Sequence, residues 1–300
     1  IAEESVDDVL KFAEWKVPVS LVYHRTSDLQ SHRDSNPASK VKIPEEIFFA
    51  PNPLDRCRIH PLPPKPAISS VEDLPKGGNL LPIDTEFVVL STPKKITRRD
   101  GRITEYRPSR SGLARVSILK CEEDNKETAL VLDEHIVARQ PIADYLTRFS
   151  GIVAGDLDPS TSKFPVVTLK SMYLKLRILV DRGCVFVGHG LRKDFWICNL
   201  FVPDSQIRDT VQLFKLPYER MISLRYLAYH LLELEIQGVT HDSIEDADAA
   251  LLLYCKYKEL QANGTFTETL KSIYDKGRAS NWKLKDKEEA TNTDESFQFA

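Results

Sequence analysis

Four carboxylates and one histidine stand in three short stretches of this chain, in types and spacings suited to binding divalent metal. Asp84 and Glu86 lie in LPIDTEFVVL, Asp194 follows VFVGHGLRK, and His241 precedes Asp246 in THDSIEDADAALLLY. Carboxylate oxygens are the ligands that hard divalent cations prefer, and a histidine of ordinary pKa can take a proton from an attacking water. Brought together by a fold, these side chains would form a two-metal centre for phosphodiester hydrolysis.

Neither of the first two stretches predicts a metal ligand by itself, since a strand with one polar face also accounts for the Asp-x-Glu pair. Asp84 and Glu86 are two positions apart in an apolar run typical of a buried strand, so both carboxylates project from one face. Two buried carboxylates repel each other, and a divalent cation offsets that repulsion. Asp194 follows a Gly-His-Gly turn at the end of another strand. An acid at a helix start also complements the helix dipole, so that structural role is an equal alternative for Asp194 alone.

The third stretch combines helix capping with a histidine that capping does not explain. Ser243 is predicted as the N-cap of a helix, which accounts for acidic residues such as Asp246 in the first helical turn. His241 lies on the loop before that cap, where its imidazole could reach a water near the carboxylates, so it is the predicted general base. His189, in the Gly-His-Gly turn, is predicted to position the site rather than to act in catalysis.

The elements that would position these residues alternate between strand and helix from position 79 onward. Apolar runs and period-two patterns predict strands at 80–90, 113–120, 128–136 and 184–190, although Pro82 is unusual inside a central strand. Helical spacing predicts helices at 143–151, 169–183, 191–201, 222–236 and 243–260. This alternation predicts an α/β fold with a mixed sheet flanked by helices.

The residues before this alternating region are predicted to belong to a different domain. Apolar stretches at 17–24 and 43–51 are strand-like, and a segment dense in proline follows them. We therefore predict residues 1–60 as the β-rich end of a preceding domain and 61–77 as a Pro-rich linker. Residues 78–283 form the predicted catalytic domain, and 284–300 a flexible charged tail poor in apolar residues. Because the sequence begins with Ile1, we expect a fragment of a longer protein.

Composition narrows the class of protein further. The chain has 300 residues, enough for two domains, and no apolar run near the ~20 residues that span a bilayer. Its 5 cysteines are scattered and lack metal-like spacing, which is typical of reduced thiols in an intracellular protein. The net charge is −3, yet residues 92–120 hold nine basic against two acidic side chains, a local +7. That run is either a solvated basic hairpin or, as its place after the first acidic motif favours, a phosphate-facing loop.

The motifs resemble those of DEDDh-type 3′→5′ exonucleases of the RNase H-like superfamily. Asp84 and Glu86 match the first exonuclease motif, Asp194 the second, and His241 with Asp246 the third. Over roughly residues 75–285, longer phrases such as IDTEFV, RPSRSGLARVSIL, FVGHGLRKDF and HDSIEDADAALLLY resemble the family of Pan poly(A)-specific ribonuclease catalytic subunits. The resemblance implies an RNase H-like fold, preceded by a ubiquitin-hydrolase-like domain that lacks peptidase function.

This resemblance also implies an activity, cofactors and partners. The four carboxylates would hold two Mg²⁺ ions, with Mn²⁺ as an alternative, and poly(A) tails of mRNA would be shortened with release of 5′-AMP. The implied partners are single-stranded poly(A) RNA, a Pan regulatory subunit and poly(A)-binding protein, with no membrane. The implied location is the cytoplasm, including mRNA-processing bodies. Rival hypotheses are a DEDDh exonuclease acting on other RNA or DNA 3′ ends, and an autoinhibited or scaffolding RNA-binding fragment.

Aromatic side chains near the motifs are the candidates for holding a single strand. Phe87, Tyr145 and Phe149 are predicted to stack on bases, with core packing as the equal alternative for each ring. His189 completes the set of predicted RNA contacts. Nothing in the sequence spells out a hydrogen-bonding code for adenine, so a preference for poly(A) is expected only from the resemblance.

Overall fold

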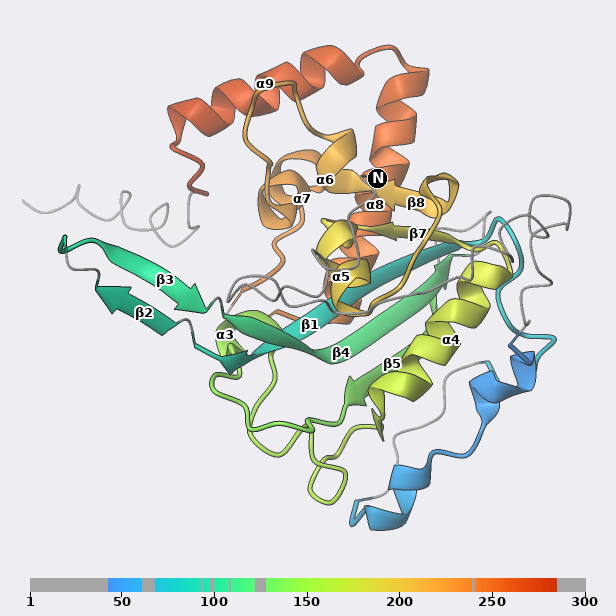
Figure 1. Cartoon of the computed structure of the whole chain (residues 1–300). Helices are drawn as coiled ribbons and strands as arrows, with labels where there is room; N and C mark the ends of the chain where they lie inside the picture. The colour runs from blue at the N-terminus through green and yellow to red at the C-terminus, as the bar shows by residue number, and fades with distance from the viewer. Residues whose placement is uncertain are drawn as a thin grey trace, which may run out of the picture. The chain divides into compact units, whose positions relative to one another are not determined.

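A six-stranded mixed sheet carries the predicted acidic residues on its central strand (Figure 1). In this computed structural model the described residues are 43–60, 68–92, 94–97, 100–107, 109–121, 128–238 and 241–284. The strand order is β6-β5-β4-β1-β7-β8. The strands are β1 (Leu80–Ser91), β4 (Arg110–Cys121), β5 (Thr128–Ile136), β6 (Val166–Val167), β7 (Val185–Gly188) and β8 (Ile207–Asp209). β4 runs antiparallel to β1 and β5, whereas the β1–β7, β7–β8 and β5–β6 pairs are parallel, which confirms the predicted mixed sheet.

Alternation along β1 separates a core face from an acidic face. Leu81 and Ile83 are fully buried and pack in the main apolar cluster, whereas Asp84 and Glu86 project from the other face. Pro82 pairs in parallel register with Val187 on β7, and register pairing with β4 begins only one residue later. The missing N–H of the proline therefore falls before the β1–β4 ladder, which explains how a central strand accommodates it.

Helices cover both faces of the sheet. On the face of Leu81 and Ile83 lies α4 (Leu169–Asp181), whose buried Met172 and Leu176 join the same apolar cluster. The short α5 (Leu191–Ile197) contributes Phe195 to that cluster. On the acidic face, the N-terminus of α8 lies against β4, where the Ser117 and Ser243 hydroxyls meet. The elements that build a second apolar cluster with α8 (Ser243–Ala262) are α6 (Thr210–Leu213), α7 (Leu224–Leu232) and α9 (Phe266–Ala279).

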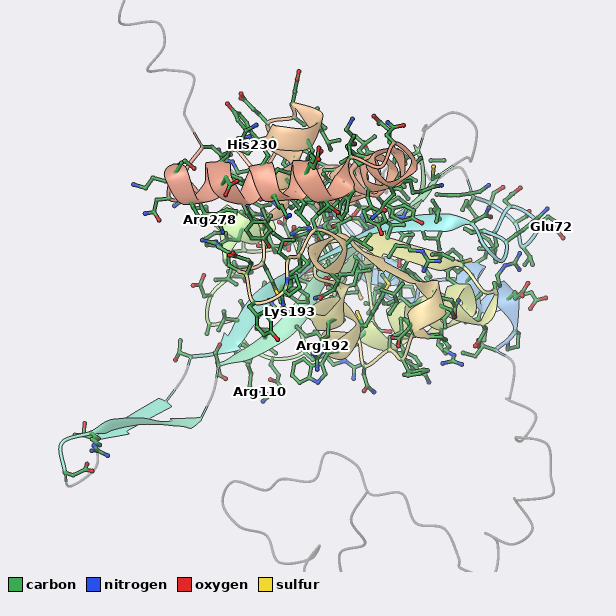
Figure 2. The ribbon with its side chains drawn as sticks, turned by 90° about the horizontal axis from the view of Figure 1, so that it is seen from above. Glu72, Arg110, Arg192, Lys193, His230 and Arg278 are labelled. Atoms are coloured by element: carbon green, nitrogen blue, oxygen red, sulfur yellow. The ribbon has the colours of Figure 1, made fainter. Side chains whose placement is uncertain are left out.

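A two-stranded ribbon extends beyond the sheet between β1 and β4 (Figures 1 and 2). It consists of β2 (Lys94–Thr97) and β3 (Ile103–Arg107), paired antiparallel. Five of the nine basic side chains of the run 92–120 lie outside the described side chains, so a phosphate-facing role stays a prediction. Among the helices that the structure describes, none has the length and apolar character needed to cross a membrane.

Residues 43–60 pack with the catalytic fold instead of forming strands. The unit that contains the sheet begins at Ile43, and the stretch predicted as strand 43–51 is a 3-10 helix, η1 (Glu45–Phe49), so that prediction was wrong. Pro44 starts this turn, and its Phe48 is buried in the main apolar cluster. A second 3-10 helix, η2 (Pro53–Cys57), follows. The described part of the predicted preceding domain therefore contributes no strand.

Part of the predicted Pro-rich linker is also packed against the sheet. Leu74 is buried, and the Arg182 guanidinium donates to the carbonyl oxygens of Leu74 and Pro75 and pairs with Glu45. The linker residues 61–67, the predicted preceding-domain residues 1–42 and the tail residues 285–300 lie outside the described residues. The character predicted for these three segments stays a prediction.

Candidate active site

Strand β1 and helix α8 bring three of the predicted carboxylates together. Asp84, Glu86 and Asp246 each offer an oxygen atom, and these atoms all lie within 4.8 Å of one another. Glu86 and Asp246 are buried, and Asp84 is half-buried. We call these three residues the acidic centre. Its donor set is entirely oxygen, which matches the ligand preference of Mg²⁺ and Mn²⁺.

The start of α8 places Asp246 over β1. Asp242, and not Ser243 as predicted, is the N-cap: its side chain accepts from the Ile244 N–H at 3.1 Å. Ser243 instead turns its buried hydroxyl toward Ser117 on β4, which fixes the helix end to the sheet. The Asp246 N–H then donates to the Asp242 carbonyl at 2.9 Å, so Asp246 sits one turn inside the helix and faces the acidic pair of β1.

Asp194 reaches the site from the opposite face of the sheet. It lies in the first turn of α5, is buried, and accepts a hydrogen bond from the Thr85 hydroxyl. Thr85 alternates with the acids of β1 and so points toward α5. Asp194 is not one of the three clustered carboxylates, yet its charge is among those that raise the pKa of Asp84. The structure thus brings Asp194 close to the acidic centre while its Oδ1 is held by Thr85.

Side chains from β8 and α6 hold the Gly-His-Gly turn that leads to Asp194. Gly190 has φ 93, a left-handed conformation that glycine adopts without cost, and its N–H donates to Asp209 Oδ1 at 2.8 Å. His189 contacts Thr210 Oγ1 through Nδ1 at 2.8 Å and the Ile222 carbonyl through Nε2 at 3.1 Å. Burial lowers the pKa of His189 to about 4. Both ring nitrogens are engaged within the protein. This favours a role for His189 in positioning the turn and disfavours its predicted contact with RNA.

His241 lies beside the acidic centre on the loop before α8. Its Nδ1 is 3.6 Å from Asp246 Oδ2, and its side chain is 25% exposed. Burial, with the nearby Arg225 charge, lowers the pKa of His241 below its usual value. The imidazole is therefore neutral at neutral pH and able to accept a proton. A close backbone contact also fixes this loop: a Cβ on Gly151 (φ 67) would lie 2.9 Å from the His241 carbonyl oxygen.

Crowding of the carboxylates concentrates negative charge at this site. Burial and the charges of Glu86, Asp194 and Asp246 raise the pKa of Asp84 well above its usual value. Burial and Asp246 raise the pKa of Glu86 to about 8. Burial also raises the pKa of Asp194 and of Asp246 to about 6. The buried Asp246 Oδ1 has no hydrogen-bond partner among the described residues, so these residues fit a divalent cation as the missing partner.

A second polar cluster lies on the same sheet face and contains none of the predicted catalytic residues. The Arg115 guanidinium donates to both oxygens of Asp133, at 2.7 and 3.0 Å, and to Asp242 Oδ1 at 3.1 Å. The Ser117 hydroxyl donates to Asp133 Oδ1 at 2.8 Å and meets Ser243. We call these five residues the Arg115 network. Arg115 was counted in the basic run 92–120, but its side chain is only 15% exposed and is tied inward, so it does not serve a phosphate-facing loop.

Two further contacts to predicted ligands also lack a sequence signal. Thr85 holds Asp194, as described above, and the Gln237 side-chain amide donates to Asp246 Oδ2 at 2.8 Å. Thr85 stands between the two acids of its strand, and Gln237 lies nine positions before its partner in a loop. Neither spacing to the partner matches a helix or strand repeat, so periodicity could not have paired them.

The three candidate stacking rings differ in their surroundings. Tyr145 packs against the small apolar cluster beside β1, and Phe87 against the main cluster, which favours packing for both. Phe87 also lies under the Lys193 ammonium, 4.5 Å from its ring centroid. Phe149 is 57% exposed and meets the His241 ring edge-on, with centroids 5.9 Å apart. Among the three, Phe149 is the ring best placed to meet a base beside His241.

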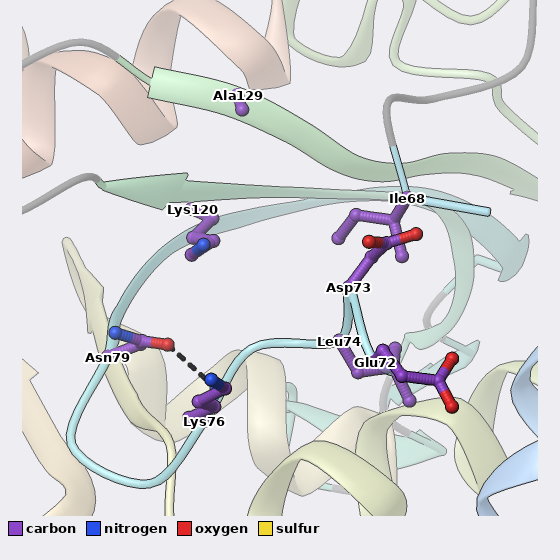
Figure 3. A pocket seen from close by; sticks show the side chains of 8 residues that line it. All are labelled: Ile68, Glu72, Asp73, Leu74, Lys76, Asn79, Lys120 and Ala129. Carbon is purple, nitrogen blue, oxygen red and sulfur yellow. Dashed lines mark hydrogen bonds between the residues drawn. The ribbon is translucent and has the colours of Figure 1, made fainter. Parts of the chain in front are cut away.

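A cavity of about 430 Å³ lies at the other end of the sheet (Figure 3). It is lined by Ile68, Glu72, Asp73, Leu74, Lys76, Asn79, Lys120 and Ala129. These residues gather where β1 begins, β4 ends and β5 begins. None of the predicted site residues lines it, so the cavity is separate from the acidic centre.

Comparisons with known proteins identify the fold around this site. The family model described as Exonuclease matches residues 81–254, which include all five predicted catalytic residues. The catalytic subunit PAN2 of the PAN2-PAN3 deadenylation complex of Homo sapiens is 40% identical over 294 residues. The corresponding subunit of Schizosaccharomyces pombe is 41% identical over 277 residues. These alignments cover 95% and 88% of this chain, but only 24% and 23% of the relatives, so the chain spans about a quarter of their length.

Solved structures agree with the sequence relatives. The apo Pan2 pseudoubiquitin hydrolase-RNA exonuclease module of Saccharomyces cerevisiae matches with a TM-score of 0.66 and 40% identity, covering 80% of this chain and 37% of that one. The same module in complex with AAUUAA RNA matches with a TM-score of 0.68 and 40% identity, covering 81% and 38%. The chain is thus similar to the exonuclease part of these modules, and the mixed α/β fold predicted from the sequence is confirmed.

Proposed function

Because the chain belongs to the Exonuclease family, we propose that it is a metal-dependent 3′→5′ exoribonuclease that shortens the poly(A) tails of mRNA and releases 5′-AMP. The observation that carries this proposal is the acidic centre, where three carboxylate oxygens lie within 4.8 Å of one another and burial, together with the like charges, raises the pKa of Asp84 and Glu86. The preference for poly(A) rests on the relatives, which are catalytic subunits of deadenylation complexes.

The acidic centre would hold two divalent ions with the help of Asp194. Asp84, Glu86 and Asp246 supply the clustered oxygens, and Asp194 lies close enough to Asp84 to raise its pKa. When bound, Mg²⁺ supplies Lewis-acid activation of the attacking water and of the phosphate oxygens. Buried carboxylates that are held before substrate arrives keep their charge aimed at the reacting phosphate, which lowers the reorganisation needed during the reaction.

His241 would act as the general base. Its lowered pKa keeps the imidazole neutral near pH 7, and its position 3.6 Å from Asp246 puts it at the rim of the acidic centre. A proton taken from the attacking water would reside on His241, where the neighbouring Asp246 carboxylate stabilises the imidazolium. The exposed quarter of the ring would then return the proton to solvent.

The rim of the site would hold the 3′-terminal nucleotides. Phe149 offers an exposed ring next to His241, suited to stacking on a base. Lys193 precedes Asp194, and Arg110, Lys193 and Arg192 lie on one side of the molecule in the view of Figure 2, where they could meet phosphates. Basic and aromatic side chains of this kind suit a single strand, whose bases are free to stack and whose phosphates attract positive charge.

Partners and location extend the proposal beyond the site. The relatives' name couples PAN2 to PAN3 in one complex, so we propose a PAN3-type regulatory subunit as the partner of the longer protein. Poly(A)-binding protein as a second partner, and the cytoplasm with mRNA-processing bodies as the location, rest on the motif resemblance alone. A pulldown with the regulatory subunit, using the longer protein, tests the first of these.

The decisive assay measures AMP release from a 3′-hydroxyl oligo(A) with Mg²⁺, for the unmodified chain, Asp84→Ala and His241→Ala. Release by the unmodified chain that both substitutions abolish or strongly reduce is the expected result. If deoxy-oligo(A), or oligomers with interspersed guanosines, are degraded as fast as oligo(A), the chain would be a general 3′ exonuclease and not a deadenylase. Intact RNA binding without release would favour an autoinhibited or scaffolding fragment.

A further inference from the structure

The orientation of Asp246 depends on a residue outside the five motif positions. We propose that Gln237 is a positioning residue that holds Asp246 with one carboxylate oxygen free for metal. The Gln237 side-chain amide donates to Asp246 Oδ2 at 2.8 Å, while Asp246 Oδ1 is buried with no partner among the described residues. The two oxygens of one carboxylate are therefore divided between a fixed protein donor and an open position.

The contact is built into the backbone of the loop that joins α7 to α8. Gln237 has φ 56, a left-handed conformation that costs a residue with a Cβ about 1 kcal/mol or more. The preceding Ile236 is buried in the apolar cluster of α7 and α8, which anchors this turn. A loop held in an unfavourable conformation next to a buried carboxylate is consistent with a local contact that offsets the cost.

An amide is the side chain best matched to this task. It donates a hydrogen bond to Oδ2 without bringing a positive charge that would compete with a cation for Asp246. An acidic side chain at 237 would repel Asp246, and an apolar one would leave both carboxylate oxygens without a fixed donor. His241 Nδ1 lies 3.6 Å from the same Oδ2, so Gln237 and His241 sit together on the side away from the free oxygen. Losing Gln237 would let the carboxylate rotate, and metal affinity would fall.

This inference rests on the proposed metal site, so its test measures metal binding directly. Mn²⁺ binding is followed by electron paramagnetic resonance, without RNA, for the unmodified chain and for Gln237→Met, which keeps an unbranched side chain but removes the donor. The matched control is Gln261→Met at the exposed far end of α8. Thermal unfolding in EDTA is recorded for all three, because a purely structural residue would lower the melting temperature without changing Mn²⁺ affinity.

We expect Gln237→Met to weaken Mn²⁺ binding by roughly tenfold or more, as losing a partner of a metal ligand usually does, and Gln261→Met to leave it unchanged. Gln237→Glu, which replaces the donor by a repelling oxygen, should bind no more tightly than Gln237→Met. Unchanged or tighter binding by Gln237→Met would overturn the positioning role while leaving the proposed exonuclease intact. A failure of the unmodified chain to bind Mn²⁺ would overturn the metal site and this inference together.

Discussion

The acidic centre and the Arg115 network lie on the same face of the sheet, beneath the same helix end. In the Arg115 network opposite charges are paired, whereas in the acidic centre carboxylates lie next to carboxylates. In the network, the carboxylate of Asp133 receives both a bidentate guanidinium and a serine hydroxyl. In the acidic centre, Asp84 and Glu86 face Asp246, so that like charges meet. Burial and the neighbouring carboxylates raise the pKa of Asp84 well above its usual value and that of Glu86 to about 8, although the charge of Arg115 lowers the latter.

Structural and functional polar groups in a buried sheet face differ in whether they satisfy one another. A structural cluster satisfies its own hydrogen bonds and charges, because any unpaired buried group costs stability. A cluster that brings like charges together and leaves Asp246 Oδ1 without a partner among the described residues is suited to a partner from outside the chain. The acidic centre therefore lowers the stability of the fold but can bind a cation. The Arg115 network instead fixes the end of α8 that carries Asp246.

The largest effect is expected from removing a charge in the acidic centre. Asp84→Asn should reduce AMP release by roughly 10³-fold or more, because it removes a metal-facing oxygen at the reacting phosphate. The same change should raise the melting temperature in EDTA, since it relieves repulsion with Glu86. Single-turnover assays and thermal unfolding measure the two effects. A variant that loses stability and activity together would contradict the division between the two clusters.

Breaking the Arg115 network should lower stability, whereas Asp84→Asn should raise it. Arg115→Met leaves Asp133 half-buried without its cation, and should destabilise the chain by about 3 kcal/mol, the lower end for a broken buried pair. Urea denaturation at neutral pH measures the change. Arg102→Met is the matched control, because Arg102 pairs with Asp100 while 85% exposed, and its loss should change stability by less than about 0.5 kcal/mol. Equal effects of the two substitutions would remove the network's structural role.

The pH dependence of stability without metal should report the acidic centre. The folded pKa values are about 6 for Asp246 and about 8 for Glu86, above the ordinary carboxyl range. Protonation therefore favours the folded chain: this stability is fully present below about pH 4 and is lost as pH rises through 6 and 8. Glu86→Gln should remove part of that loss, with a gain of up to about 5 kcal/mol at the alkaline end, the limit set by a pKa raised from 4.5 to about 8. The melting temperatures of the unmodified chain and of Glu86→Gln, recorded in EDTA across this pH range, measure the gain. In saturating Mg²⁺ the unmodified chain should instead have the higher melting temperature.

The smallest effect is expected at the rim. Phe149→Ala should weaken oligo(A) binding by about fivefold, near 1 kcal/mol, the low end for one stacked base, because the ring is half exposed. Fluorescence anisotropy with a Ca²⁺-containing buffer measures binding without hydrolysis. Phe201→Ala, which removes an exposed ring after α5, is the control and should leave binding unchanged. If Phe149→Ala binds oligo(A) as tightly as the unmodified chain, Phe149 does not stack on a base.

Short-range periodicity predicted the elements that carry the acids. The strand holding Asp84 and Glu86 was predicted from its apolar run within one residue of its observed bounds, and the spacing of two placed both acids on one face. The mixed α/β sheet followed from the alternation of strands and helices. The helix carrying Asp246 was also predicted, although the cap is Asp242 and not Ser243, since either residue type can cap and the Ser117 contact decided between them.

Contacts between distant residues could not be predicted in this way. Arg115 was counted with the basic run because its partner Asp133 lies on another strand, and only the β4–β5 register joins them. Residues 45–49 were assigned to a strand on their apolar content, but Phe48 is buried from a 3-10 turn that packs against the catalytic fold. Gln237 carries no motif, so only three-dimensional proximity to Asp246 reveals it.

The contact between Gly151 and the His241 carbonyl makes the placement of His241 sensitive to a single methyl group. Gly151 ends the short α3 (Thr147–Ser150) that carries Phe149, and a methyl group added there would lie 2.9 Å from the backbone that carries His241. An alanine here would be strained at φ 67, and its methyl group would push against the His241 carbonyl oxygen, so the backbone of the two residues would have to move apart. A single methyl group at this position would therefore displace His241 without changing any carboxylate of the acidic centre.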